Sequence, residues 1–228
     1  MALLLHIDTA TSYAGVCISR DQDVIAIRES AEQKNHAAFL QPAIEQMLQE
    51  TGIVMQDLDA VSVAAGPGSY TGLRVGLASA KGICYAAGKP LIPVNTLQII
   101  AAAAMHSPEA AGREEQLLYC PMIDARRMEV FAAVYNHLLE EVVPPAAFIL
   151  NNESFSSLLA EKQVLFSGDG HFKFKEISGS SNAIFTDITH SVRNLALIAG
   201  NRFGLQQFAD LAYSEPFYIK EFFDPAAR

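Results

Sequence analysis

The sequence predicts an α/β protein of two lobes. Half of its 228 residues are apolar, which is enough for a sizeable core. The first hundred residues alternate strand-like and helix-like segments in the order βββαβαβα, and a polar linker at 106–116 separates them from a second, weaker αβ pattern. We therefore expect an N-terminal lobe at 1–105 and a smaller C-terminal lobe with a tail at 106–228.

Three β-rich runs open the chain, at 2–8, 13–19 and 23–29. The first is apolar and ends in an acid. The polar pair Arg20–Asp21 between the second and third runs predicts a hairpin. We therefore expect three neighbouring strands.

The rest of the first lobe alternates between helix and strand. Phe39, Ile44, Met47 and Leu48 lie at helical spacing, so a helix is expected from His36 to the glycine at 52. Further segments are predicted as a strand at 58–65, a helix at 71–88, a strand at 90–94 and a helix at 96–105.

The second lobe has fewer clear signals. Residues 117–135 predict two strands joined by a turn at Asp124–Arg127, and 154–163 and 191–207 predict helices. The segment GDGHFKF at 168–174 is interpreted as a glycine-rich connection. No exact internal repeat is visible.

Charge and cysteine content narrow the function classes. The formal net charge is −9, and this surface would repel phosphates, so we do not expect the chain to bind RNA or DNA tightly by itself. Cys17, Cys84 and Cys120 lie far apart without metal-site spacing, which predicts buried, reduced thiols in a cytoplasmic protein.

The N-terminus and the apolar runs predict neither secretion nor membrane insertion. The opening MALLLHIDTA has no basic region before its apolar run, so no signal peptide is expected. No run approaches the roughly 18 apolar residues of a membrane span.

A glycine-rich turn, AAGPGSYTGLRVG at 64–76, lies between a predicted strand and a predicted helix. A P-loop would need glycine where Thr71 stands and lysine after Gly72, where Leu73 stands. A dinucleotide fingerprint would need one residue fewer between its glycines and an acid about twenty residues later. The turn therefore matches neither phosphate-binding motif.

The helix after this turn carries a stripe of small residues, since Gly72, Gly76 and Ala80 recur every four positions. Glycine within a helix costs about 1 kcal/mol relative to alanine, so its repetition indicates that another backbone approaches closely. Either packing within the chain or a subunit interface explains the stripe.

Four stretches resemble the TsaB family, once called YeaZ: GPGSYTGLRVGLASAKG at 66–82, LLHIDTATSYAGVCIS at 4–19, NHAAFLQPAIEQML at 35–48 and PMIDARRMEVFAAVY at 121–135. The resemblance covers the first lobe and the start of the second. It implies two ribonuclease-H-like lobes of the actin/Hsp70/sugar-kinase (ASKHA) superfamily, with the second lobe reduced.

The resemblance also implies a function. TsaB proteins are non-catalytic partners of the paralogous enzyme TsaD, which makes threonylcarbamoyladenosine beside the tRNA anticodon, and a small ATPase, TsaE, joins them. It implies a heterodimer with TsaD, a homodimer when TsaD is absent, and contact with tRNA only through the complex.

Catalytic metal ligands are not expected in this chain. TsaD-like proteins carry an H-x-x-x-H pair after the strand that follows the glycine turn, and here these positions are Thr96 and Ile100. No H-x-x-x-H occurs among the six histidines. We therefore expect no catalytic residue, no metal and no intrinsic cofactor, with ATP or ADP bound at most within the complex.

The expected partner interface combines the small-residue stripe, the glycine turn and the apolar face of the 36–51 helix. A bulky residue at position 76 is expected to separate the partners and leave the lobe folded. The predicted interface residues are His36, Phe39, Leu40, Ala43, Gly66, Gly68, Ser69, Tyr70, Thr71, Gly72, Arg74, Gly76 and Ala80.

The alternative function is an independent actin-like ATPase or phosphotransferase. It would use the hydroxyl-rich turn Asp8, Thr9, Thr11 and Ser12 to contact nucleotide. A purely structural turn is favoured there, because Thr and Ser commonly close turns through their own backbone. An interaction protein without a tie to tRNA is a third alternative.

Two further segments leave alternatives open. Asp124, Arg126 and Arg127 form either a solvated hairpin or a partner or nucleotide contact. The aromatic tail PFYIKEFF at 216–223 docks either on a lobe or on TsaE.

Overall fold

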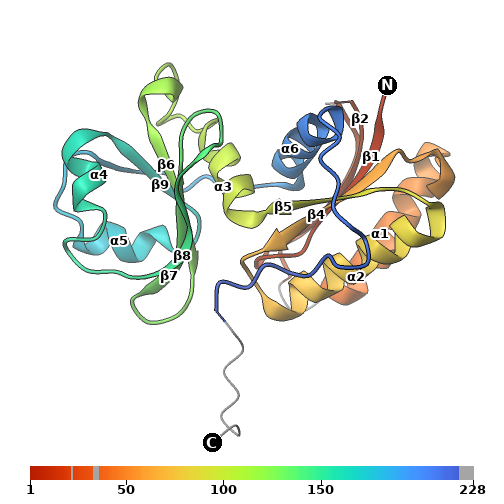
Figure 1. Ribbon diagram of the computed structural model, residues 1–228, viewed down its shortest axis with the longest axis horizontal. Helices are drawn as coiled ribbons and strands as arrows, with labels where there is room; N and C mark the ends of the chain where they lie inside the picture. Colours follow the sequence, from red (N-terminus) through yellow and green to blue (C-terminus); the bar gives the residue numbers. More distant parts are fainter. Residues whose placement is uncertain (22, 33–35, 221–228) are drawn as a thin grey trace, which may run out of the picture.

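The computed structural model describes residues 1–21, 23–32 and 36–220, which form two lobes side by side (Figure 1). The first lobe is built on a five-stranded sheet of order β3-β2-β1-β4-β5. β1 pairs antiparallel with β2 and parallel with β4. These strands are β1 (Leu3–Asp8), β2 (Ala14–Arg20), β3 (Asp23–Ser30), β4 (Ala60–Gly66) and β5 (Leu91–Asn95). The predicted order of elements in this lobe is confirmed.

Helices cover both faces of the first sheet. α1 (His36–Thr51) and α2 (Tyr70–Ala87) lie on one face, where they pack with Leu5 and Ile7 of β1. The opposite face packs against α6 (Val192–Gly204) and part of α3 (Thr96–Ala104). Successive side chains of a strand point to opposite faces of the sheet, so β1 contributes Leu5 and Ile7 to the core on one face and Leu4 to the core on the other.

α3 also joins the two lobes. Its Leu97, Ile100 and Ala104 are buried in one cluster with Tyr119 and Leu165 of the second lobe (Figure 1). Short 3-10 helices at η1 (Met55–Asp57) and η2 (Glu114–Gln116) complete the connections.

The second sheet repeats the topology of the first. Its order is β10-β9-β6-β7-β8, so a three-strand meander is again extended by two parallel strands beside its first strand. The strands are β6 (Leu118–Asp124), β7 (Glu129–Tyr135), β8 (Glu141–Ile149), β9 (Val164–Ser167) and β10 (Ala183–Phe185). The chain therefore contains a structural duplication, which the sequence does not display as a repeat.

The second lobe is reduced in its helices and in its last two strands. α4 (Ser156–Glu161) and α5 (His171–Ile177) are short, whereas the sheet has five strands like the first. The interpretation of 168–174 as a connection was wrong, because α5 begins within it. β9 and β10 escaped prediction because runs of four and three residues carry no measurable period. β8 escaped because of its paired prolines, which an edge strand tolerates.

The chain returns to the first lobe after the second. Val192, Leu195 and Ala199 of α6 are buried in one cluster with Leu4 and Ile92 of the first sheet. The first lobe therefore consists of the predicted segment 1–105 together with α6. The expected boundary at Met105 divides the two sheets, but α6, which follows it in the chain, belongs to the first lobe.

No helix in the described part of the chain is long and apolar enough to cross a membrane. All three cysteines are buried and unpaired, as predicted. Burial raises the pKa of all three thiols, and that of Cys84 reaches about 11.

Candidate functional site

The glycine turn between β4 and α2 is fastened to the turn between β1 and β2. The backbone N–H of Ser69 donates to the carbonyl of Ala10 at 2.7 Å. Side chains at Gly68 or Gly72 would collide with the carbonyl oxygens of the β1–β2 turn. The glycines therefore permit two backbone turns to touch, and Ser69 then caps α2 by accepting from the N–H of Gly72.

The small-residue stripe of α2 faces the chain's own sheet. Gly72, Gly76 and Ala80 are buried, and a side chain at position 76 would collide with the hydroxyl of Thr9. The expectation that this stripe is a partner surface is therefore corrected. Packing within the chain accounts for it, because β1 occupies the space beside it.

The remaining predicted interface residues divide into inner and outer groups. Leu40 and Ala43 are buried in the first core, Phe39 packs against it, and the His36 imidazole lies 2.9 Å from the carbonyl oxygen of Thr11. Gly66 is likewise buried within the turn. The exposed members are Ser69, Tyr70, Thr71 and Arg74, at the beginning of α2.

A different face of α1 and α2 is open to solvent. On α2 it carries Ala78, Gly82 and Ala86, and a side chain at Gly82 would meet nothing within 4 Å. Tyr85 on the same face is 84% exposed. The amide of Gln41 donates to the Ser79 hydroxyl at 2.9 Å and joins this face to α1. The exposed residues of α1 nearby include Ala37, Ala38 and Pro42. Most side chains of this α1–α2 outer face other than Tyr85 and Gln41 are small.

The turn predicted to contact nucleotide uses most of its polar groups internally. Thr9 donates its hydroxyl proton to the carbonyl of Gly72 at 2.7 Å. Asp8 accepts from the N–H of Ala10, and Thr11 accepts from the N–H of Tyr13. These hydrogen bonds are those that a structural turn makes.

A cavity of about 380 Å³ lies between the lobes, and of the four predicted nucleotide residues only Thr11 and Ser12 line it. Its other lining residues are Tyr13, Ala31, Ile100, Gly168, Asp169, His171, Phe172, Asp187, Ile188, Thr189 and His190. None of the described lining residues is a lysine or an arginine, and two are aspartates. The cavity is therefore poorly matched to a triphosphate.

Two histidine–aspartate pairs flank this cavity, and sequence analysis missed both. His190 Nε2 lies 3.3 Å from Asp8 Oδ2, and His171 Nε2 lies 3.1 Å from Asp187 Oδ1. Each histidine is isolated in the sequence, so no spacing could have indicated its partner. The first strand of each lobe ends in an aspartate, Asp8 in β1 and Asp124 in β6. This correspondence was the one feature of the sequence that indicated the duplication of the sheet.

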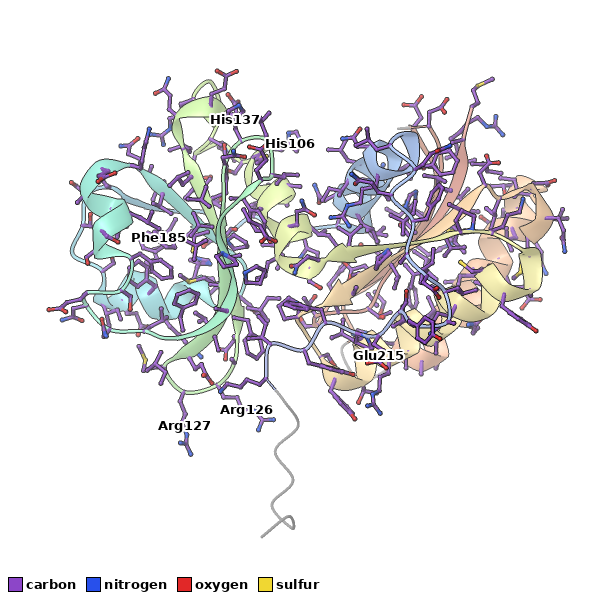
Figure 2. All side chains as sticks on the ribbon, viewed as in Figure 1. His106, Arg126, Arg127, His137, Phe185 and Glu215 are labelled. Carbon is purple, nitrogen blue, oxygen red and sulfur yellow. The ribbon has the colours of Figure 1, made fainter. Side chains whose placement is uncertain are left out.

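The turn at Asp124–Arg127 is a solvated hairpin in this structure. Asp124 accepts from the N–H of Arg126 at 2.6 Å and from Lys173 at 2.7 Å. Partial burial raises the pKa of Asp124, but the hydrogen bonds from Lys173 and the Arg126 backbone outweigh it, so the net shift is downward. Figure 2 shows Arg126 and Arg127 extending away from the lobe.

Within the described part of the chain, no group of three or more His, Cys, Asp or Glu side chains could hold a metal ion. The two positions that correspond to the TsaD histidine pair have other uses. Thr96 is buried and accepts from the N–H of Gly66 at 3.2 Å, and Ile100 belongs to the core between the lobes.

Comparison with known proteins assigns the family. The model of the family described as TsaD, tRNA N6-adenosine threonylcarbamoyltransferase, matches residues 26–219. The Bacillus subtilis tRNA threonylcarbamoyladenosine biosynthesis protein TsaB is 34% identical over 199 residues, which cover 83% of this chain and 82% of that protein. This chain belongs to the TsaB family.

Other TsaB proteins and solved structures agree with this assignment. The Escherichia coli TsaB is 33% identical over 132 residues, which cover 58% of this chain and 54% of that protein. The structure of YeaZ from Pseudomonas aeruginosa has a TM-score of 0.79 at 21% identity and covers 96% of this chain and 100% of that one. That likeness shows the shared two-lobed α/β fold.

Proposed function

We propose that this TsaB-family chain is a non-catalytic subunit that binds and activates a TsaD-type enzyme. The enzyme transfers a threonylcarbamoyl group to the adenosine beside the tRNA anticodon, with TsaE as a third component. Membership of a family named for threonylcarbamoyladenosine biosynthesis supports this role. Because the net charge of −9 disfavours direct binding to tRNA, we expect contact with tRNA to be made through the partner. The complex would act in the cytoplasm.

The α1–α2 outer face carries the proposal. Small side chains on two neighbouring helices allow the helices of a partner to approach closely over a long contact, and exposed Tyr85 supplies an aromatic anchor. The face continues to Tyr70, Thr71 and Arg74 at the start of α2. In the absence of the TsaD-type partner, a second copy of this chain would use the same face.

The proposal that this chain is non-catalytic rests on Thr96 and Ile100, which stand where TsaD-like proteins have their histidine pair. Their side chains fasten the glycine turn and fill the core between the lobes, so neither is free to ligate a metal. A TsaD-type partner would therefore supply the chemistry.

The alternative function, an independent ATPase, would use the cavity between the lobes. Thr11 and Ser12 line this cavity and could contact a nucleotide, but Asp169 and Asp187 also line it and would repel phosphates. Isothermal titration of the purified chain with magnesium-ATP up to millimolar concentration tests this alternative, and tight binding would support it over the accessory role.

The direct test is the solution mass of the chain, alone and mixed with the TsaD-type protein of the same organism. We expect a one-to-one complex that displaces a homodimer. Gly82→Arg should abolish the complex, because the arginine blocks close helix approach. Gly179→Arg, at another exposed glycine with nothing within 4 Å, should leave it unchanged. If the wild-type chain forms no complex with the TsaD-type protein, the proposal is contradicted.

A further inference from the structure

The segment after α6, residues 205–220 and here called the C-terminal strap, lies along α2 and ends at the second lobe (Figure 1). Its backbone is bound at several points along the first lobe. The N–H of Ala209 donates to the carbonyl of Leu91 at 3.0 Å, and Lys81 of α2 donates to the carbonyl of Ser214 at 2.9 Å. Figure 2 shows Glu215 of the strap beside α2.

The end of the strap is seated on the glycine turn and the first turn of α2. The N–H of Phe217 donates to the carbonyl of Ala65 at 2.7 Å, and its own carbonyl lies where a side chain at Gly66 would be. The Tyr218 ring stacks on Tyr70 with centroids 5.5 Å apart. The sequence alternative in which the tail docks on a lobe is therefore confirmed for residues 216–220, and 221–223 lie outside the described residues.

Arg74 completes this contact. Its guanidinium lies 4.1 Å from the Tyr70 ring centroid and donates from Nε to the Tyr218 hydroxyl at 3.1 Å. Beyond it, Lys220 forms an ion pair of 2.5 Å with Glu129 of the second lobe. The strap thus spans from the first lobe to the second across the beginning of α2.

The strap end is held only at the surface. Phe217 and Tyr218 are 43% and 38% exposed, and Lys220 is 53% exposed in its side chain. A surface ion pair, one stack, one exposed side-chain hydrogen bond from Arg74 and one main-chain hydrogen bond each contribute little to stability. The strap end can therefore detach without unfolding either lobe.

The strap end and the proposed partner surface share Tyr70 and Arg74. We propose that the C-terminal strap is a built-in competitor, which must release Phe217–Lys220 before a TsaD-type partner can cover the beginning of α2. This inference rests on the proposed function. Release would also break the Lys220–Glu129 link, so partner binding is coupled to a change in how the strap ties the lobes together.

The test is a binding titration with the TsaD-type protein of the same organism. It compares the wild-type chain with a chain ending at Ser214, which keeps the Lys81 contact, and with Tyr218→Ala. Tyr213→Ala is the matched control, because Tyr213 lies on the same strap with 85% of its surface exposed. A chain ending at Lys220 controls for the loss of the remaining terminus. Circular dichroism verifies that each variant is folded.

We expect the chain ending at Ser214 to bind the TsaD-type protein about tenfold more tightly than the wild-type chain does. This factor applies if roughly one wild-type molecule in ten has its strap released, because only that fraction can bind. Tyr218→Ala should shift affinity in the same direction, and both controls should match wild type. Unchanged or weaker binding by both altered chains, with wild type binding normally, would overturn the strap proposal alone. Binding by none of the chains would overturn both the strap proposal and the proposed function.

Discussion

His6 lies in β1 with its imidazole buried between two serine hydroxyls. Nδ1 is 2.7 Å from the Ser62 hydroxyl and Nε2 is 2.8 Å from that of Ser19. Burial lowers the pKa of His6 from 6.5 to about 3, since no acid compensates for the lost hydration of the imidazolium. The side chain is therefore a neutral connector of three strands.

Folding stability should depend on pH through this residue. The unfolded chain binds a proton at His6 below pH 6.5 whereas the folded chain does not, so stability is present above pH 6.5 and is lost as pH falls. The contribution is about 1.4 kcal/mol per pH unit. Urea unfolding at pH 7, 6 and 5 should show a stability that falls with pH in wild type, more steeply between pH 6 and 5 than between pH 7 and 6, and His6→Gln should lower the slope between pH 6 and 5 by up to this amount.

A matched control for the His6 experiment is His137→Gln, because His137 is exposed at the surface of the second lobe (Figure 2). This variant should keep the wild-type slope. Equal slopes in His6→Gln and wild type would show that His6 is not the titrating group.

At the scale of single elements, α2 has two small-residue faces with opposite roles. The inner face packs Gly76 and Ala80 against β1, which explains why the periodicity was visible in the sequence. The outer face carries Ala78 and Gly82. Periodicity alone cannot distinguish them, since both repeat every four residues.

Substitutions at the two helix glycines should therefore act in opposite directions. Gly76→Ala should destabilise the chain by about 1 to 3 kcal/mol, because the methyl group collides with Thr9. Gly82→Ala should stabilise it by about 0.5 to 1 kcal/mol, because the site is open and alanine favours the helix. Thermal unfolding of both variants measures the difference. Destabilisation by Gly82→Ala would contradict the assignment of the outer face.

At the scale of the whole molecule, α6 makes the first lobe discontinuous. It follows the second sheet in the chain but covers the first sheet, so neither lobe is a simple stretch of sequence. α3, also of the first lobe, packs against the second lobe. The first lobe thus holds α6 from beyond the second sheet and sends α3 into the contact between the lobes.

Weakening α6 should loosen the first lobe selectively. Leu195→Ala removes a fully buried side chain from the cluster with Leu4 and Ile92, and we expect a loss of about 2 to 5 kcal/mol. Hydrogen exchange should accelerate in β1 and β4 more than in β6 and β9. Leu205→Ala, at a side chain that is 69% exposed, is the control with almost no effect. Equal acceleration in both sheets would contradict the discontinuous lobe.

Local patterns in the sequence were sufficient for the first lobe. Its strands and helices are long enough to show a period of two or 3.6, and the glycine turn has a composition with few alternatives. The family resemblance, the buried cysteines and the absence of phosphate motifs also followed from the letters alone.

Only the tertiary structure decided which faces of those elements are buried. The duplication of the sheet, the return of α6, the histidine–aspartate pairs and the strap on Tyr70 all join residues distant in sequence. Local propensity contains no information about such pairs, because their energy arises only when the chain is folded. The sequence therefore determined the elements of residues 1–105 and the family, and the packing of β1 against α2 decided that the small-residue stripe belongs to the core.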